Sequence, residues 1–305
     1  MPARLLIHVG YHKTATSWMQ QLLFTPEHGF RQIAGHREVF DHIVAPHGLR
    51  FDAAAARAMV GRGLDGLGHG AVPEISSEIL SGHPFFGGIG SDIYAERLKS
   101  IAPDARILIS IRAQRRILPS VYMQYLSRGG TMGWKQFFAG ETDIGYAAFR
   151  PEHFEYDRLV ALYRALFGAV NVHVLTQESL KADMASAVAG LAAFAGTTDY
   201  GGLSPAARRV YAPSYPEYAA PFLRRANHFR KSVLNPNPVL TLGGSAGGPY
   251  RLAGGVLRRF PFAPLLAGRR PVSAYVADRF AGYFDASNAR LGALLGGGTD
   301  LSDYR

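Results

Sequence analysis

The sequence predicts an α/β fold of three layers, in which a central parallel sheet lies between two layers of helices. Short apolar runs alternate with longer helical patterns, and the runs lack the polar alternation of a strand with one exposed face. The composition is that of an ordinary globular protein, with 48% hydrophobic and 11% aromatic residues among 305. In such folds ligands bind at the carboxyl ends of the strands.

Four apolar runs are predicted strands: residues 4–9, 106–111 and 170–175, and a weaker run at 71–75. Each is short and bounded by Gly, Pro or polar residues, as strands buried on both faces are. Helices are predicted at residues 17–24, 92–101, 117–127, 156–167, 178–195, 216–229 and 273–295.

No internal repeat is visible, so we predict one domain over residues 1–305. The glycine-rich stretch 242–255 is either a mobile loop of that domain or a plain flexible linker. No apolar run reaches about 18 residues, so we expect no transmembrane segment. The first apolar segment is followed too soon by His12 and Lys13 for a signal peptide, so we expect a soluble, cytoplasmic protein.

Charge and cysteine content limit the possible functions. The chain has no cysteine, which excludes disulfides, thiolate metal ligands and a cysteine nucleophile. The formal charge of +10 favours an anionic partner, which could be a nucleotide, an acidic glycan, nucleic acid or a membrane surface. Basic residues cluster at 112–116, 222–231 and 251–260 and at Arg269 and Arg270, although each cluster could equally be a solvated face.

The loop after the first predicted strand has the residues of an anion site. It reads HVGYHKTATSW (8–18), and it would present backbone N–H groups at the start of a helix. Gly10 would allow the turn, and Lys13 adds a cation. Three hydroxyl residues follow: Thr14, Thr16 and Ser17. The loop predicts a phosphate cradle, and the alternative is a polar turn with a surface lysine.

This loop differs from the nucleoside triphosphate loop G-x-x-x-x-G-K-[ST]. The second glycine before Lys13 is absent, and so is the four-residue gap. No aspartate suited to Mg²⁺ follows a later predicted strand. Both observations count against a kinase or an ATPase.

A second motif points to another phosphate. Residues 105–126, ARILISIRAQRRILPSVYMQYL, read as a buried strand that ends at Arg112, followed by a helix that carries Ser120. An arginine fork and a serine hydroxyl eight residues later could converge on one phosphate. Two phosphate sites on neighbouring strands suggest a doubly phosphorylated nucleotide.

These two motifs resemble those of the sulfotransferases that use 3′-phosphoadenosine 5′-phosphosulfate, and the chain is similar to bacterial members of that family. GYHKTATS resembles the loop for the 5′-phosphosulfate, and SIRAQRRILPSVY resembles the 3′-phosphate motif, with Arg112 and Ser120 at matching positions. Further stretches resemble the family at residues 76–81, 154–180 and 283–296, and more loosely at 229–236. The resemblance implies a fold similar to that of P-loop nucleotide hydrolases.

One position departs from the family pattern. Ala15 stands where the family commonly has glycine. Alanine fits the turn if its φ is negative, as in the first turn of a helix, so we expect a small adjustment rather than a lost site.

The resemblance implies transfer of a sulfuryl group from 3′-phosphoadenosine 5′-phosphosulfate to a hydroxyl or amine, leaving adenosine 3′,5′-bisphosphate, with no metal required. Lys13 would stabilise charge on the leaving phosphate. The donor-binding residues implied are His12, Lys13, Thr14, Ala15, Thr16 and Ser17 for the 5′-phosphate, Arg112 and Ser120 for the 3′-phosphate, and Arg230 and Lys231 as additional contacts.

The catalytic base is open among three residues. Glu78 follows a predicted strand and would lie beside the loop, but a carboxylate there could equally begin a helix. His12 and His83 are the alternatives, and each could instead donate to an oxygen or pack. His8, within a strand, is predicted to be a hydrogen-bonded core residue.

The acceptor predicted is a carbohydrate or glycolipid, with peptide tyrosine, a phenol or a lipid hydroxyl also open. Aromatic residues at 83–88 and after Tyr211 could stack on it or belong to the core. Two other functions are weighed: a nucleoside or sugar kinase, which would need magnesium, and a non-catalytic polyanion-binding protein. No nucleic-acid partner is expected, since no recognition motif is visible. The oligomeric state is left open.

Overall fold

The computed structural model describes residues 4–68, 70–140, 148–209, 215–239, 266 and 268–304. The chain divides into two compact units. The sheet unit comprises Met1–Ala113, Pro151–Tyr211 and Phe284–Arg305, and the helical unit comprises Gln114–Arg150 and Ala212–Tyr283. That these form one domain stays a prediction, and the glycine-rich stretch 242–255 lies outside the described residues.

The sheet unit is built on five parallel strands in the order β2-β3-β1-β4-β5. The strands are β1 (Leu6–His8), β2 (Phe30–Ala34), β3 (Val72–Ser76), β4 (Arg106–Ile111) and β5 (Val172–Thr176). The four predicted strands are therefore present. β1 lies at the centre, with Leu6 in register with Glu74 of β3 and Arg106 of β4.

Strand β2 was not predicted. Its sequence, FRQIA, places Arg31 and Gln32 in the middle of the strand, where they are partly or fully exposed. β2 pairs only with β3, so it is an edge strand, and such a strand need not be apolar along its length. The apolar pattern of a doubly buried strand is accordingly missing.

One face of the sheet carries a continuous apolar cluster. Leu6, Val72, Leu108 and Leu175 project from four strands into it. The helical cover comes from α1 (Thr16–Trp18), the π-helical turn Met19–Leu23 that continues it, α8 (Gln177–Ala182) and α9 (Met184–Ala195). This packing anchors the helix that follows the opening loop.

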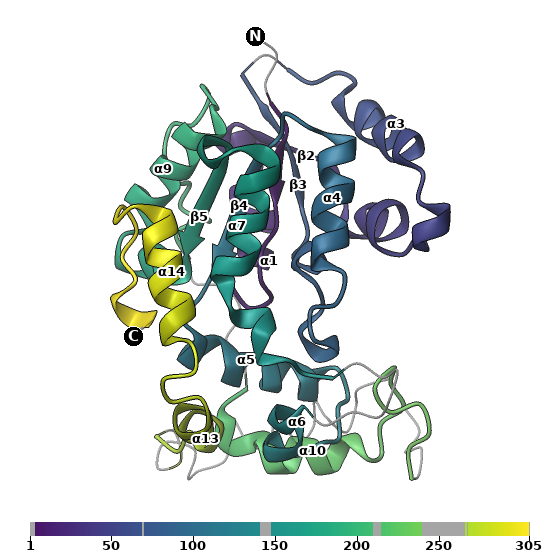
Figure 1. Ribbon diagram of the computed structural model, residues 1–305, viewed down its shortest axis with the longest axis vertical. Helices are drawn as coiled ribbons and strands as arrows, with labels where there is room; N and C mark the ends of the chain where they lie inside the picture. The colour runs from purple at the N-terminus through teal and green to yellow at the C-terminus, as the bar shows by residue number, and fades with distance from the viewer. Residues whose placement is uncertain are drawn as a thin grey trace. The chain divides into compact units, whose positions relative to one another are not determined.

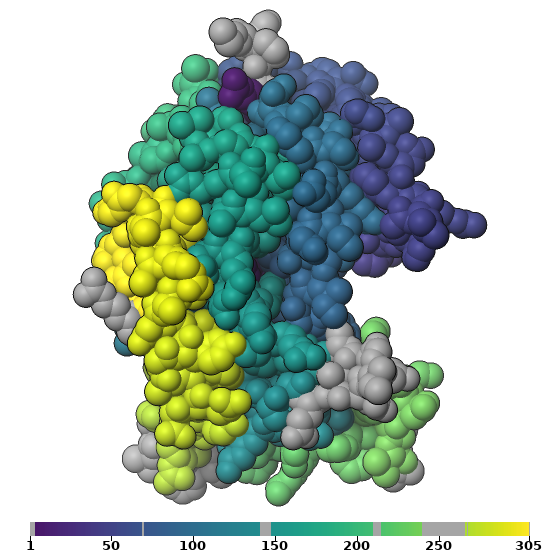
Figure 2. Space-filling view, in the orientation of Figure 1, coloured from purple at the N-terminus to yellow at the C-terminus, as the bar shows by residue number. Residues whose placement is uncertain are grey.

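Other helices cover the opposite face (Figure 1). They are α4 (Ser91–Ile101) and α7 (Tyr156–Phe167), and the C-terminal helix α14 (Asp285–Leu295) packs on α7 (Figure 2). Helix α3 (Ala53–Leu64) packs near β2. Helices on both faces confirm the predicted three-layer α/β architecture.

Three predicted helices are interrupted. The helix predicted at 178–195 divides at Asp183, whose carboxylate caps α9 by accepting from the N–H of Ser186 at 3.0 Å. The helix predicted at 273–295 divides into α13 (Pro271–Arg279) and α14. The helix predicted at 216–229 is a 3₁₀ turn, Glu217–Ala219, followed by α10 (Ala220–Asn227).

The helical unit is assembled around α5 (Gln114–Ser127). Helices α10 and α13 both pack on α5, and α6 (Trp134–Ala139) adds to an aromatic core. That core includes Tyr122, Tyr125, Phe137, Phe138 and Phe149. Among the residues that the structure describes, no helix has the length and apolar character needed to span a bilayer.

The remaining elements are short and connect these layers. They are α2 (His36–Val39), the π-helical turn Phe40–Val44, and the 3₁₀ turns Pro26–His28, Gly48–Arg50, Glu78–Ser81, Pro84–Phe86, Pro151–Phe154, Ala169–Asn171 and Ser302–Tyr304. The turn Glu78–Ser81 directly follows β3, so it brings Glu78 to the carboxyl edge of the sheet.

Candidate functional site

The candidate site lies at the carboxyl edge of the three central strands. The loop with Lys13 follows β1, Glu78 follows β3 and Arg112 follows β4. Because β1 pairs with both β3 and β4, the loop with Lys13 is flanked by the other two strand ends. The connections after β1 and β4 lead to opposite edges of the sheet, which is the topology at which α/β folds bind ligands.

His8 ties the three strands together beneath the loop. Its Nδ1 lies 2.7 Å from the hydroxyl of Ser76 on β3, and its Nε2 lies 2.8 Å from the hydroxyl of Ser110 on β4. Burial lowers the pKa of His8 to about 3, so the ring is neutral. The prediction of a hydrogen-bonded core histidine is confirmed.

The network continues into the loop through Thr14. Its hydroxyl donates to the carbonyl of Tyr11 at 2.6 Å and lies 2.7 Å from the hydroxyl of Ser110. Because its one proton is used within the loop, this hydroxyl orders the loop. Donation from it to a phosphate, which the motif predicts, would require that bond to break.

Thr16 and Ser17 differ from Thr14. Thr16 begins α1, and its buried hydroxyl has no hydrogen-bond partner among the described residues. Buried polar atoms are almost always paired, so this hydroxyl fits a donor to an anionic oxygen of a ligand. Ser17 is exposed at the next position.

Gly10 is required by space rather than by its φ angle. A Cβ at this position would lie 2.6 Å from the hydroxyl oxygen of Ser110 and 2.7 Å from Nε2 of His8. Gly10 is absent from the described glycines with positive φ. The glycine therefore lets the loop pass against the His8 network, which differs from the turn role that the sequence suggests.

The loop backbone is strained at two non-glycine residues. Lys13 and Ala15 have φ values of 70° and 71°, in the left-handed region that favours glycine. The expectation that Ala15 has a negative φ is wrong. Ala15 is the N-cap of α1, and it adopts the conformation that a glycine would hold without strain.

Arg112 and Glu78 both act electrostatically on Lys13. The pKa of Lys13 is lowered by burial and by the nearby guanidinium of Arg112, while the carboxylate of Glu78 opposes that shift. Arg112 also contacts the loop directly, with its Nη1 3.4 Å from the carbonyl oxygen of Lys13. Two cations and one carboxylate therefore lie at the ends of neighbouring strands.

The backbone after β4 is held by side chains that sequence reasoning missed. The Tyr156 hydroxyl donates to the carbonyl of Arg112 at 2.6 Å. The carboxylate of Glu178 accepts from the N–H of Ala113 at 3.3 Å and from the Tyr304 hydroxyl at 3.1 Å. Nothing in the local sequence pairs these residues, since they lie far apart along the chain.

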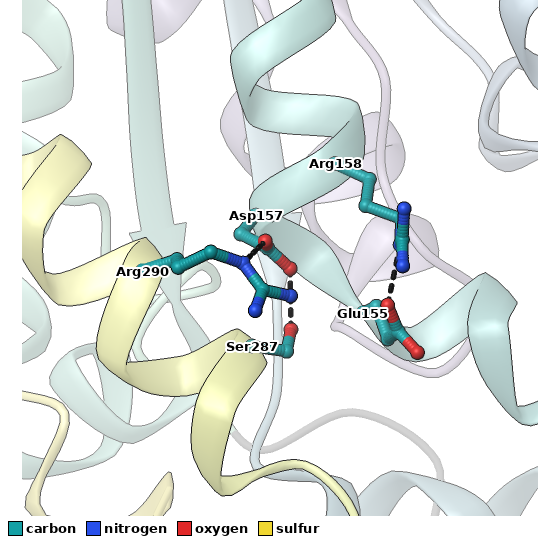
Figure 3. A network of polar contacts seen from close by, with 5 residues as sticks. All are labelled: Glu155, Asp157, Arg158, Ser287 and Arg290. Atoms are coloured by element: carbon teal, nitrogen blue, oxygen red, sulfur yellow. Dashed lines mark hydrogen bonds and ion pairs between the residues drawn. The ribbon is translucent and has the colours of Figure 1, made fainter.

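The C-terminal segment that carries Tyr304 is itself fixed to α7. In Figure 3 the carboxylate of Asp157, on α7, accepts from the hydroxyl of Ser287 and from Nε of Arg290, both on α14. The side-chain amide of Asn288 donates to the carbonyl of Tyr304 at 2.5 Å. The same figure shows Arg158 paired with Glu155 at the start of α7.

Histidines and aromatic residues lie beside the loop. The rings of His12 and His83 are 5.1 Å apart, and His83 also packs against Phe85 and Phe86. Nδ1 of His83 accepts from the N–H of Phe85 at 3.3 Å. Glu78 begins the 3₁₀ turn Glu78–Ser81, as the structural alternative for this residue predicts, and it is only partly buried.

Three predicted donor-binding residues belong to the helical unit. Ser120 is partly buried on α5. Arg230 donates through Nη1 to the carbonyl of Ser127 at 2.8 Å, and its own carbonyl accepts from the side chain of Asn235 at 3.2 Å. Lys231 is exposed. Arg230 therefore anchors the segment after α10 to the end of α5, and binding of a phosphate by these residues stays a prediction.

A solved structure matches the fold over its full length. The crystal structure of a sulfotransferase from Alicyclobacillus acidocaldarius aligns with all of this chain and all of its own, with a TM-score of 0.60 and 19% sequence identity. The chain has a sulfotransferase fold. No family model and no curated protein matches the sequence. The sequence motifs had singled out the loop GYHKTATS (residues 10–17) and Arg112.

Proposed function

We propose that the protein transfers a sulfuryl group from 3′-phosphoadenosine 5′-phosphosulfate to a hydroxyl or amine of a carbohydrate or glycolipid. The observation that carries this proposal is the placement of Lys13, Arg112 and Glu78 at the ends of neighbouring central strands in a sulfotransferase fold, where Arg112 and Glu78 both act on Lys13. The donor residues, the acceptor class and the cytoplasmic location are all part of the proposal.

The loop after β1 would bind the 5′-phosphosulfate. The buried hydroxyl of Thr16 supports this role, because it lacks a partner among the described residues and a phosphate oxygen would supply one. His12, Ala15 and Ser17 would add contacts from the same loop. Thr14 would act through its bonds to Tyr11 and Ser110, which hold the loop in place.

Arg112 would bind the 3′-phosphate that distinguishes this donor from ordinary nucleotides. A guanidinium can present two parallel N–H donors to a phosphate. Ser120, Arg230 and Lys231 are further candidates for phosphate contacts, as the sequence motifs predict.

Lys13 would stabilise the leaving group. As the acceptor oxygen attacks sulfur, the bond from sulfur to the bridging phosphate oxygen breaks and negative charge grows on that oxygen. The cation of Lys13 interacts more strongly with this developing charge than with the ground state. Its lowered pKa also favours partial proton donation to the same oxygen.

Glu78 would accept the proton of the acceptor hydroxyl. It is partly exposed, and its carboxylate influences Lys13, so it lies near the reacting group proposed. His12 and His83 remain the alternatives for this base. Phe86, with 45% of its surface exposed beside His83, would contact a sugar ring of the acceptor.

Calorimetric titration tests the donor site directly. Adenosine 3′,5′-bisphosphate, ADP and ATP would each be titrated with and without magnesium. We expect metal-independent binding that favours the bisphosphate and is weakened by Arg112→Ala, with the exposed Arg57→Ala as the matched control. Preference for ATP with magnesium would contradict the proposal and favour a kinase. Equal affinity for the bisphosphate and ADP would favour a general polyanion-binding protein.

A further inference from the structure

The formal charge is divided unevenly between the two units. The helical unit contains 15 Lys and Arg residues against 4 Asp and Glu residues, a net charge of +11. The sheet unit contains 18 against 19, a net charge of −1. All of the positive excess of the chain therefore belongs to the helical unit, and residues 218–277 contain no acidic residue.

Donor binding does not account for this excess. Lys13 and Arg112, the main cations of the proposed donor site, belong to the sheet unit. Within the helical unit only Arg230 and Lys231 are assigned to the donor, so 13 of its 15 basic residues lie outside the proposed donor site. A second, larger anionic partner would account for them.

Exposed apolar side chains accompany the basic residues. Phe222 is 52% exposed on α10, and Arg225 is exposed three residues later on the same side of that helix. Ala220, Leu223 and Asn227 form the buried side of α10. This short helix thus presents a large aromatic ring and a cation together to solvent.

The segment after α10 extends the same surface. A turn closed by Ser232 and Asn235 presents Val233, which is 95% exposed. The N–H of Val239 donates to the carbonyl of His228 at 3.0 Å, which brings Val239, 74% exposed, back to the end of α10. Two bulky aliphatic side chains are therefore held in solvent beside a basic helix.

Helix α13 adds further positive charge. Arg269 and Arg270 are exposed just before α13 begins at Pro271. Helices α10 and α13 pack on the same helix, α5 (Figure 1). Exposed arginines therefore lie on α10 and just before α13 within the helical unit.

We propose that the helical unit binds the surface of an anionic lipid bilayer through a basic and apolar surface. The exposed side chains that we assign to this surface are Phe222, Val233, Val239, Arg225, Arg269 and Arg270. The arginines would be attracted to anionic headgroups, and the three apolar side chains would enter the interface between headgroups and acyl chains. The aliphatic residues favour a bilayer over an anionic polymer, because Val233 and Val239 cannot stack on a base or pair with a charged sugar.

Co-sedimentation with vesicles tests this surface. The full chain would be mixed with vesicles of phosphatidylcholine alone or with an equal share of phosphatidylglycerol. We expect binding only to the anionic vesicles, and weaker binding as salt rises. The triple variant Arg225→Gln, Arg269→Gln, Arg270→Gln should lower the partition coefficient on the order of 100-fold, about five-fold for each arginine.

Apolar variants separate a bilayer from a polymer. Phe222→Ser, Val233→Ser and Val239→Ser together should lower binding to anionic vesicles about ten-fold or more, because their apolar area would no longer leave water. Matched controls in the sheet unit are Arg50→Gln, Arg57→Gln and Arg62→Gln for charge, and Leu49→Ser and Val170→Ser for apolar exposure. These controls should bind like the unchanged chain, and circular dichroism would check that every variant is folded.

Two outcomes would overturn the inference. One is no binding to anionic vesicles at low salt. The other is binding that the apolar variants leave unchanged and that heparin displaces fully, which would assign the surface to a soluble polyanion instead. Neither outcome bears on the proposed transferase activity, because the vesicle assay contains no donor.

Discussion

Strain in the opening loop is concentrated at single residues. Lys13 and Ala15 both hold left-handed φ values, which costs an L-residue roughly 1–2 kcal/mol at each position. Strain of this kind is found where surrounding contacts hold a functional backbone in place. Here the contacts are the hydrogen bonds of Thr14 and the packing of α1.

Replacing Ala15 by glycine should stabilise the protein. The substitution relieves the strain at φ 71°, although glycine loses more backbone entropy on folding, so we expect a net gain of about 0.5 kcal/mol. Urea unfolding would measure it. Ala189→Gly, at an exposed position inside α9, should show the opposite sign with a loss of about 1 kcal/mol. A loss at Ala15 as large as that at Ala189 would contradict the strain argument.

Lys13 should determine the rate of transfer. Lys13→Ala removes the cation from the leaving phosphate, so we expect turnover to fall about 10²- to 10³-fold. The Michaelis constant of the acceptor should change little, because the interaction grows mainly in the transition state. Steady-state kinetics with an accepted sugar would check this, and unchanged turnover would rule out the leaving-group role.

Glu74 should make stability depend on pH. Its carboxylate is buried in the middle of β3 without a hydrogen-bond partner among the described residues, and burial raises its pKa well above the ordinary value. The folded chain therefore keeps this proton to a higher pH than the unfolded chain does. Stability from this group is present at acid pH and falls, by up to about 1.4 kcal/mol per unit, as pH rises above the unfolded pKa.

Glu74→Gln should remove that dependence. As pH rises from about 5 to about 8, we expect the free energy of unfolding of the variant to increase relative to that of the unchanged chain. Denaturant titrations at several pH values would measure the difference. A difference that stays constant over this range would show that Glu74 is not the titrating group.

At the scale of elements, the C-terminal segment positions a residue far from it in sequence. Tyr156 on α7 bonds the carbonyl of Arg112, and Tyr304 reaches Ala113 through Glu178. These are positioning residues, since they touch the backbone beside Arg112 rather than the proposed ligand. Their hydrogen bonds hold the backbone from which the Arg112 side chain extends.

Removing the Tyr156 hydroxyl should weaken binding of the 3′-phosphate and leave binding of the 5′-phosphate unchanged. Tyr156→Phe is expected to weaken binding of adenosine 3′,5′-bisphosphate about five-fold, as loss of one hydrogen bond worth about 1 kcal/mol would. Binding of adenosine 5′-monophosphate should not change, because the substitution keeps the aromatic ring that packs on Tyr11 of the loop. Calorimetry gives both constants, with Tyr94→Phe on α4 as control. Equal losses for both nucleotides would indicate a general structural effect.

Elements that are buried on both faces could be predicted from sequence. β1, β3, β4 and β5 are apolar runs, and their order along the chain is enough to suggest a parallel sheet. β2 could not be found in this way, because Arg31 and Gln32 lie on an edge. The division of the helix 178–195 at Asp183 carried a signal, since an aspartate before an apolar segment is a common N-cap.

Part of the candidate site could be predicted because its residues directly follow strands that are buried on both faces. Strand ends carry Lys13, Glu78 and Arg112, so local sequence was sufficient to select them. Tyr156 and Tyr304 depend on where distant segments pack, which no local pattern records. The φ of Ala15 was mispredicted because the hydrogen bonds of Thr14 and the packing of α1 hold the turn, and not the residue's own preference.

At the scale of the whole molecule, the separation of charge should affect stability. The helical unit carries a net +11 and repels itself. Raising sodium chloride from about 0.05 M to about 0.5 M shortens the Debye length and should raise the thermal midpoint, by about 2–4 °C for each kcal/mol of repulsion screened. The triple arginine variant described above should show a smaller rise, and a fall in both would contradict this account.

The parallel pairing of β1 also determines when the loop can form. His8 and Ser110, whose hydrogen bond supports the loop, are separated by 102 positions. A growing chain therefore holds β1 without this support until β4 has been synthesised, and contacts of such range make folding slow. The loop of residues 10–17 precedes most of the chain, yet the hydrogen bond between His8 and Ser110 that supports it can form only after residue 110, more than a third of the 305 residues, has been synthesised.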